Sequence, residues 1–214
     1  MLHTYLFDFD GTLVDSMPVY VSTMLHILDE YRIPYDPDIV RIITPLGLRG
    51  ASRYFQTLGL NMDEESMILL MKKTMAEAYF HTIPAKNNVI ETLRVLKARG
   101  EDLNVLTASP HFTLDACLKR LGIFDLFTNV WSCDDFSTTK SDPEIYRMAA
   151  ARLGKPVDQI LFLDDNLNAD KTAVSAGMKV CAVHDASSEE YADEMKRVAD
   201  AYICDFSELI GLDV

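Results

Sequence analysis

Short apolar runs of strand length alternate with helical stretches over most of the chain. The runs occupy residues 4–7, 103–106, 128–131, 160–163, 179–183 and 201–203. After Pro84, helical patterns lie between them, at residues 89–99, 112–121, 143–153, 169–176 and 189–198. Strands that alternate with helices form a parallel sheet with right-handed crossovers and helices on both faces. The pattern therefore predicts one α/β core.

The segment from residue 16 to residue 81 differs, because it contains helical patterns and no convincing strand. Its first helix begins after Asp15 or Ser16, either of which can cap it, and Pro18 lies in its first turn. Further helices are predicted from residue 36 to a break at residues 44–47, and over residues 50–58 and 63–81. We therefore expect residues 1–15 and 84–214 to form the α/β core, and residues 16–83 to form an all-helical insertion.

The length and composition agree with this organisation. A chain of 214 residues, 49% hydrophobic and 25% charged, is typical of a folded protein with one sizeable core and a smaller inserted module. No apolar run approaches the length that crosses a bilayer, and residues 1–5 lack the features of a signal peptide, so we expect a cytoplasmic protein without membrane contact. The cysteines lie far apart and predict buried thiols in a reducing compartment: Cys117, Cys133, Cys181 and Cys204.

The formal net charge of −13 opposes binding to a phosphate backbone, so we expect no nucleic-acid partner. We expect a monomer or a weak dimer. An acidic protein that handles an anionic substrate must concentrate positive charge locally, either with a metal ion or with a few well-placed cationic side chains.

Residues that could take part in catalysis or ligand binding follow four of the predicted strands. In open parallel sheets, ligands bind outside the carboxyl ends of the strands, so these residues are expected at one edge. They are Asp8 and Asp10 after the first strand, Thr107, Ala108 and Ser109 after the second, Lys140 beyond the third, and Asp164, Asp165 and Asp170 after the fourth.

This combination of residue types suits phosphoryl transfer. A carboxylate such as Asp8 can attack phosphorus and form an aspartyl-phosphate. Carboxylates repel a phosphoester, so a hard cation such as Mg²⁺ must bridge them, with Asp8 and Asp165 as side-chain ligands. A lysine and a hydroxyl can hold the remaining phosphoryl oxygens. Asp10, two residues from the nucleophile, can act as general acid and then as general base.

Four segments resemble the motifs of the haloacid dehalogenase superfamily. Residues 7–16, Phe-Asp-Phe-Asp-Gly-Thr-Leu-Val-Asp-Ser, closely resemble its signature. Residues 103–107 are similar to its second motif, a strand that ends in Thr or Ser, and residues 140–146 are similar to its lysine motif. Residues 160–165, followed by Asp170, resemble its acidic fourth motif. The resemblance covers essentially the whole chain.

The resemblance implies a Rossmann-like core, a helical cap inserted after the first strand, and Mg²⁺-dependent chemistry. Asp8 would be nucleophile and metal ligand, and Asp10 would be the acid/base, with its backbone carbonyl on the metal. Thr107, Ala108 and Lys140 would hold the transferring phosphoryl group. Asp165 would bind the metal, and Asp164 and Asp170 would support that ligand set.

Two positions depart from the family pattern. Asp164 stands where relatives often have Gly, and because neighbouring strand residues point to opposite sides, only one of Asp164 and Asp165 is expected to face the metal. We assign Asp165, because its spacing to Asp170 fits the family. Ser141 replaces a frequent Pro, which we interpret as harmless.

The cap segment 48–53 is similar to the loop with which β-phosphoglucomutase-like relatives read their substrate. Arg49 and Arg53 are therefore candidate substrate ligands, with an ordinary solvated pair at a helix start as the alternative.

The acid at Asp10 disfavours dehalogenase and phosphonate-cleaving activity, because relatives with those activities generally lack it. The resemblance then implies a phosphatase for a small phosphorylated metabolite, with phosphoglycolate or a sugar phosphate as a typical substrate. A phosphosugar mutase is the first alternative. A binding protein that keeps the fold without turnover is the alternative from another class.

Overall fold

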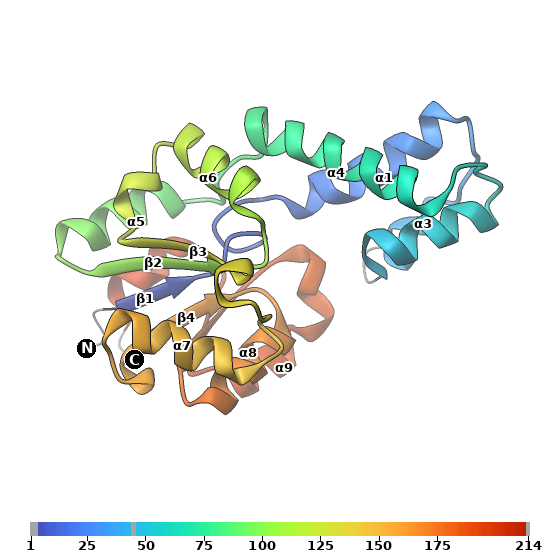
Figure 1. Cartoon of the computed structure of the whole chain (residues 1–214). Helices are drawn as coiled ribbons and strands as arrows, with labels where there is room; N and C mark the ends of the chain where they lie inside the picture. Colours follow the sequence, from blue (N-terminus) through green and yellow to red (C-terminus); the bar gives the residue numbers. More distant parts are fainter. Residues whose placement is uncertain (1–3, 44–45, 213–214) are drawn as a thin grey trace. The chain divides into compact units, whose positions relative to one another are not determined.

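The computed structural model describes residues 4–43 and 46–212 of the chain, which forms two compact units. One unit comprises Met1–Asp15 and Pro84–Val214, and the other comprises Ser16–Ile83 (Figure 1). The chain leaves the first unit after Asp15 and returns to it at Pro84. Hydrogen bonds from Asp15 N to Pro84 O (3.0 Å) and from Lys86 N to Leu13 O (3.1 Å) join the leaving and returning segments.

The first unit is built on a parallel sheet, which confirms the predicted fold class. Across the described residues it has six strands in the order β3-β2-β1-β4-β5-β6. The strands are β1 (Thr4–Phe7), β2 (Asp102–Thr107), β3 (Asn129–Ser132), β4 (Ile160–Asp164), β5 (Lys179–Val183) and β6 (Ala201–Ile203). Phe7 lies opposite Val105 of β2 and Leu163 of β4. The strand that carries the first motif therefore lies between the strands that carry the second and fourth motifs.

Helices cover both faces of this sheet, as the alternation predicts. They are α5 (Val89–Ala98), α6 (His111–Arg120), α7 (Pro143–Leu153), α8 (Leu167–Ala176) and α9 (Ala192–Val198). Short 3₁₀ segments join them: Phe124–Leu126, Cys133–Phe136, Val157–Gln159, Ala186–Tyr191 and Phe206–Gly211. The helix expected over residues 189–198 is thus split, because Asp185 caps a 3₁₀ turn whose end at Tyr191 precedes α9.

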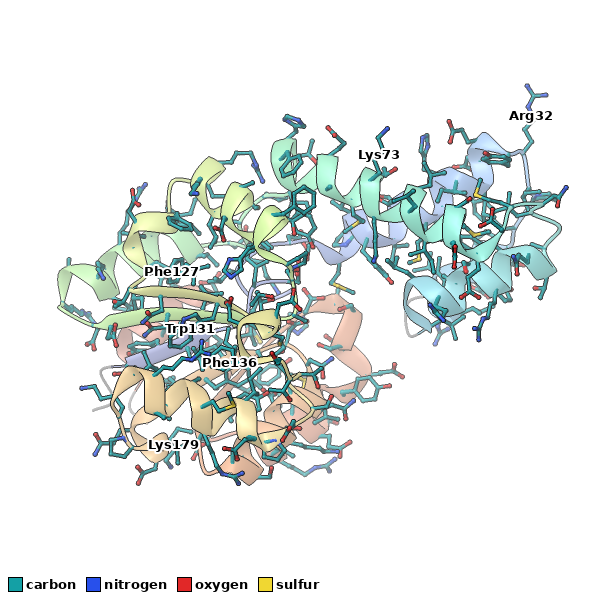
Figure 2. The ribbon with its side chains drawn as sticks, viewed as in Figure 1. Arg32, Lys73, Phe127, Trp131, Phe136 and Lys179 are labelled. Carbon is teal, nitrogen blue, oxygen red and sulfur yellow. The ribbon has the colours of Figure 1, made fainter. Side chains whose placement is uncertain are left out.

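Alternate residues of β1 pack into the two layers. Leu6 belongs to a buried cluster with Ile145 and Tyr146 of α7. Phe7 points to the other face, where its ring contacts those of Phe127 (labelled in Figure 2) and Phe206. Each fully buried side chain of this size contributes about 1.5–3 kcal/mol relative to exposure. The register of β1 is therefore fixed, and with it the position of the residues that follow Phe7.

Trp131 and Phe136, both labelled in Figure 2, anchor the segment that precedes Lys140. Their rings meet edge to face with centroids 5.5 Å apart, and the Arg152 guanidinium lies 3.8 Å from the Phe136 centroid. Such contacts each contribute about 1 kcal/mol beyond simple burial.

The second unit contains α1 (Met17–Glu30), α2 (Ile39–Ile43), α3 (Gly47–Thr57) and α4 (Glu64–His81). It has its own core, which includes Met24, Leu28, Phe55, Met67 and Met71. The expected helix break at residues 44–47 lies partly outside the described residues, at Thr44 and Pro45. Among residues 4–43 and 46–212, no helix combines the length and apolar character needed to cross a membrane.

Candidate active site

The centre of the site is a buried carboxylate cluster where β1 and β4 end. Asp8 directly follows β1, Asp164 is the last residue of β4, and Asp165 follows it. A hydrogen bond of 2.8 Å from Asp8 N to Leu163 O continues the pairing of the two strands. Each of the three carboxylates offers one oxygen, and these oxygens lie within 4.8 Å of one another. Adjacent strands therefore deliver three acidic groups to one point.

Asp164 and Asp165 both reach this cluster, although strand alternation was expected to leave only one of them there. Alternation does not extend to Asp165, because β4 ends at Asp164. The two carboxylates still have different partners. Asp164 Oδ2 pairs with Lys140 Nζ, and Asp165 Oδ1 accepts a hydrogen bond of 3.0 Å from Thr12 Oγ1. The assignment of Asp165 as the metal ligand stays a prediction.

Lys140 supplies positive charge to the cluster. Its Nζ lies 2.6 Å from Asp8 Oδ1 and 2.7 Å from Asp164 Oδ2, and its side chain is largely buried. The Tyr146 hydroxyl donates to the Lys140 carbonyl over 3.2 Å and helps to hold the lysine in place. Burial works to lower the pKa of Lys140, but the carboxylates of Asp164 and Asp8 raise it well above its ordinary value. Lys140 is therefore a permanent ammonium in this site.

The cluster carries more negative charge than Lys140 balances. Burial raises the pKa of Asp165 well above its ordinary value, and the neighbouring charges of Asp164 and Asp8 raise it further. Burial and the Asp8 charge also raise the pKa of Asp164, against the opposing effect of Lys140. Three carboxylates that face one ammonium, with hard oxygen donors directed to one point, fit a small divalent cation.

Asp170 adds a further acidic group to this region. It lies in the first turn of α8 and is fully buried, and neither of its carboxyl oxygens has a hydrogen-bond partner among the described residues. Burial, followed by the charges of Asp164 and Asp165, raises the pKa of Asp170 to about 9. A buried carboxyl without a partner is costly for stability, and the supporting role of Asp170 in the site stays a prediction.

The turn after Asp8 brings Asp10 and Thr12 to the same edge. Gly11 has a φ of +76°, and a Cβ at this position would collide with the Asp165 carboxylate. Only glycine therefore allows the turn to approach Asp165 so closely. Thr12, whose hydroxyl donates to Asp165, lies within the first motif, but the sequence alone indicated no role for it.

Asp10 is joined to the end of β2 by a short hydrogen bond, in which Ser109 Oγ donates to Asp10 Oδ2. The Ser109 backbone N–H in turn donates to Thr107 Oγ1 over 3.2 Å. Sequence reasoning placed Ser109 at this strand end without a role, because nothing local to residue 109 indicates a contact with residue 10. Thr107 is buried and Ala108 is exposed, and their phosphate-binding role stays a prediction.

The two candidate arginines of the helical unit lie on α3 and share one acidic partner. Arg49 Nε lies 3.3 Å and Arg53 Nε 2.7 Å from the Glu64 carboxylate, and both arginine side chains are well exposed. Glu64 begins α4, so these ion pairs connect α3 to α4 at the surface. Their contact with a substrate stays a prediction.

Known proteins match this chain over most of its length. The family model for haloacid dehalogenase-like hydrolases matches residues 5–183. The chain is 31% identical to the pyrophosphatase PpaX of Bacillus velezensis over 179 residues, which is 83% of this chain and 81% of that protein.

Solved structures share the fold over nearly the full length. A predicted phosphoglycolate phosphatase from Haemophilus somnus superposes with a TM-score of 0.82 and 23% identity, covering 98% of this chain and 97% of that one. A protein from Thermotoga maritima described as a candidate β-phosphoglucomutase gives 0.83 and 22%, with the same coverage. At these identities the likeness establishes the fold.

Proposed function

Because the chain belongs to the haloacid dehalogenase-like hydrolase family and is a phosphatase, we propose that it hydrolyses a small phosphorylated metabolite with Asp8 as the nucleophile and Mg²⁺ as the cofactor. The observation that carries this proposal is the placement of the Asp8 carboxylate 2.6 Å from Lys140 Nζ, inside the cluster that it forms with Asp164 and Asp165. A buried carboxylate beside a fixed ammonium, in a group of metal-compatible oxygens, is the arrangement that phosphoryl transfer through a carboxylate needs.

Asp8 attacks in the first step. One of its carboxylate oxygens bonds to phosphorus, the bond from phosphorus to the ester oxygen breaks, and an aspartyl-phosphate is left on the protein. In the second step water attacks the phosphorus of this acyl phosphate, and Asp8 is released as a carboxylate with inorganic phosphate. Lys140 neutralises oxygens that gain charge in both transition states, because its ammonium stays protonated.

Asp10 handles the proton in both steps. It protonates the leaving oxygen as Asp8 attacks, and it takes a proton from water in the hydrolysis. Ser109 donates to Asp10 Oδ2 and so orients this carboxyl group. Thr107 and Ala108, at the end of β2, hold phosphoryl oxygens in this proposal.

Asp8, Asp165 and the backbone carbonyl of Asp10 would hold Mg²⁺, supported by Asp164 and Asp170. When bound, the ion supplies the charge that allows a phosphate dianion to approach these carboxylates. The donor set of buried aspartate oxygens suits a hard cation rather than a soft one.

We propose that Ser16–Ile83 acts as a cap on the catalytic core, and that Arg49 and Arg53 contact the part of the substrate that is not transferred. Glu64 pairs with both arginines. In this proposal, an anionic or hydroxylated group of the substrate replaces Glu64 as a partner of one of them. The cysteines of the described chain are free thiols, most of them buried, which supports a reducing cytoplasm as the working compartment.

The test is phosphate release from a panel of substrates with Mg²⁺ or with EDTA. The panel contains phosphoglycolate, sugar phosphates and inorganic pyrophosphate, the last because a relative is named a pyrophosphatase. Wild type is compared with Asp8→Asn and with the matched control Asp158→Asn, an exposed aspartate that precedes β4 at the opposite edge of the sheet.

We expect release that requires Mg²⁺, persists in Asp158→Asn and falls at least about 10⁴-fold in Asp8→Asn. Silence of the wild type across the panel would sink the phosphatase proposal. Isomerisation of β-glucose 1-phosphate without net phosphate release would identify a mutase instead.

A further inference from the structure

Lys86 lies in the segment that returns to the core from the helical unit, and its ammonium donates to three oxygen acceptors. These are Gly11 O and His184 O, each at 2.6 Å, and Asp185 Oδ2 at 2.9 Å. An ammonium group has three N–H donors, so all of them are engaged. The side chains of Lys86 and Asp185 are 19% and 6% exposed, a degree of burial that charged side chains reach mainly when they are paired.

Both ends of this arrangement are fixed. The Lys86 backbone N–H donates to Leu13 O over 3.1 Å, so the Lys86 backbone is attached to the segment that follows the turn after Asp8. Asp185 Oδ1 accepts from Ser187 N (2.9 Å) and Ser187 Oγ (2.6 Å), which leaves Oδ2 for Lys86. Burial works to raise the pKa of Asp185, but the Ser187 hydroxyl and Lys86 hold it below its ordinary value, so the pair is ionic.

The acceptor at Gly11 connects this pair to the reacting groups. The Gly11 carbonyl and the Thr12 N–H belong to one planar peptide, so an ammonium that holds the carbonyl also fixes the start of Thr12. Thr12 Oγ1 then donates to Asp165, and Gly11 lies so close to Asp165 that no side chain fits between them. Lys86 is therefore linked to Asp165 through the Gly11–Thr12 peptide and the Thr12 side chain.

We propose that Lys86 and Asp185 form a positioning pair that holds the Gly11–Thr12 peptide against Asp165 and thereby keeps the carboxylate cluster in its metal-binding geometry. The inference rests on the proposed function, since it concerns the same cation and the same reaction. Neither residue contacts the carboxylates of the cluster directly among the described hydrogen bonds and ion pairs, so both are positioning residues rather than catalytic ones.

The test compares Lys86→Met with Lys179→Met. Lys179 begins β5 at the far edge of the sheet, and its Nζ lies 2.8 Å from Asp200 Oδ1. It therefore serves as a lysine–aspartate pair outside the site, although it is more exposed than Lys86 and Asp185. Three quantities are measured for each protein: Mg²⁺ affinity by titration calorimetry, kcat and KM with the best substrate of the panel, and the midpoint of thermal unfolding in EDTA.

We expect Lys86→Met to lower Mg²⁺ affinity and kcat by about 10–100-fold, as is typical when a group that supports metal ligands is removed. Lys179→Met should leave both unchanged. A Lys86→Met protein that unfolds at lower temperature, but keeps Mg²⁺ affinity and kcat within twofold of wild type, would show that the pair serves stability alone and would overturn the inference.

A second variant covers the case in which Lys86→Met does not fold. Asp185→Asn keeps the shape of the side chain and one oxygen acceptor but removes the negative charge. The interaction with Lys86 therefore weakens, while the Lys86 ammonium keeps a hydrogen-bond acceptor. We expect a smaller loss of Mg²⁺ affinity, about fivefold, and an unchanged affinity would contradict the proposal. If the wild type neither binds Mg²⁺ nor releases phosphate, the proposed function fails. If the wild type does both and the Lys86 and Asp185 variants match it, only the inference about this pair fails.

Discussion

Lys140 and Lys86 are both largely buried beside loops that follow strand ends, but the oxygen atoms around them differ. Lys140 faces the carboxylates of Asp8 and Asp164, with Asp165 close by. Lys86 faces one carboxylate and two backbone carbonyls. Charge is thus balanced around Lys86 and left negative around Lys140. A balanced buried pair holds the chain in place, whereas an unbalanced one leaves charge available for a ligand.

The largest effect is expected from Lys140→Met, because this substitution removes the ammonium that faces Asp8 and Asp164. The buried carboxylates lose their ammonium, so unfolding free energy in EDTA should fall by about 3 kcal/mol at pH 7.5, and phosphate release should nearly vanish. Urea unfolding at pH 7.5 and pH 5 measures the first effect. The loss of stability should shrink at pH 5, because protonation then relieves the carboxylates; an equal loss at both pH values would contradict the charge argument.

Asp170→Asn should sharpen the comparison, because it replaces a buried carboxyl group near Lys140 with a neutral amide that does not titrate. The folded pKa of Asp170 is raised to about 9 from an ordinary 3.8, so the folded state binds a proton that the unfolded state releases. Stability in EDTA therefore falls as pH rises between these two values, and asparagine removes that loss.

We expect Asp170→Asn to be more stable than wild type by about 2 kcal/mol at pH 8 in EDTA, with little difference near pH 4. Denaturant unfolding at the two pH values measures this. A variant less stable than wild type at pH 8 would show that Asp170 is satisfied in the metal-free protein.

The smallest effect is expected at His111, a cation site with two carboxylates but considerable exposure. His111 Nδ1 lies 3.0 Å from Asp115 and Nε2 2.8 Å from Asp135, and hydrogen bonds to these two residues raise the pKa of His111 above its ordinary 6.5. The stabilisation is present below pH 6.5 and is lost as pH rises through the higher folded pKa.

His111→Gln should cost less than about 1 kcal/mol at pH 6 and nothing at pH 9, because solvent screens an exposed pair. Thermal unfolding at both pH values checks this. A cost near that of Lys140→Met would show that burial adds little to the stabilisation that a cation gains from two carboxylate partners.

Much of the fold and of the site follows from local sequence. The strand ends at Phe7, Thr107 and Asp164 could be predicted because each apolar run stops where polar residues begin, and parallel strands end at one edge. The alternation rule does not extend to Asp165, because it applies only inside a strand and β4 ends at Asp164. Which of Asp164 and Asp165 faces the metal stays a prediction.

Other parts depend on contacts between residues far apart in the sequence. Ser109 meets Asp10 across 99 positions and Lys86 meets Gly11 across 75, and neither serine nor lysine carries a local pattern that indicates its partner. Helix starts were also approximate: α3 begins at Gly47 rather than at residue 50. Gly47 has a φ of +62°, which glycine adopts without strain, so the helix can start there.

The central position of β1 has a consequence for the order of folding. This strand is synthesised first, yet its partners begin at Asp102 and Ile160. At about 5–20 residues per second, an apolar strand waits several seconds on the ribosome for its first neighbour, while the helices of Ser16–Ile83 can already form from contacts close in sequence. The strand that precedes Asp8 is thus joined into the sheet late, so the carboxylate cluster is assembled only after Asp164 and Asp165 have emerged.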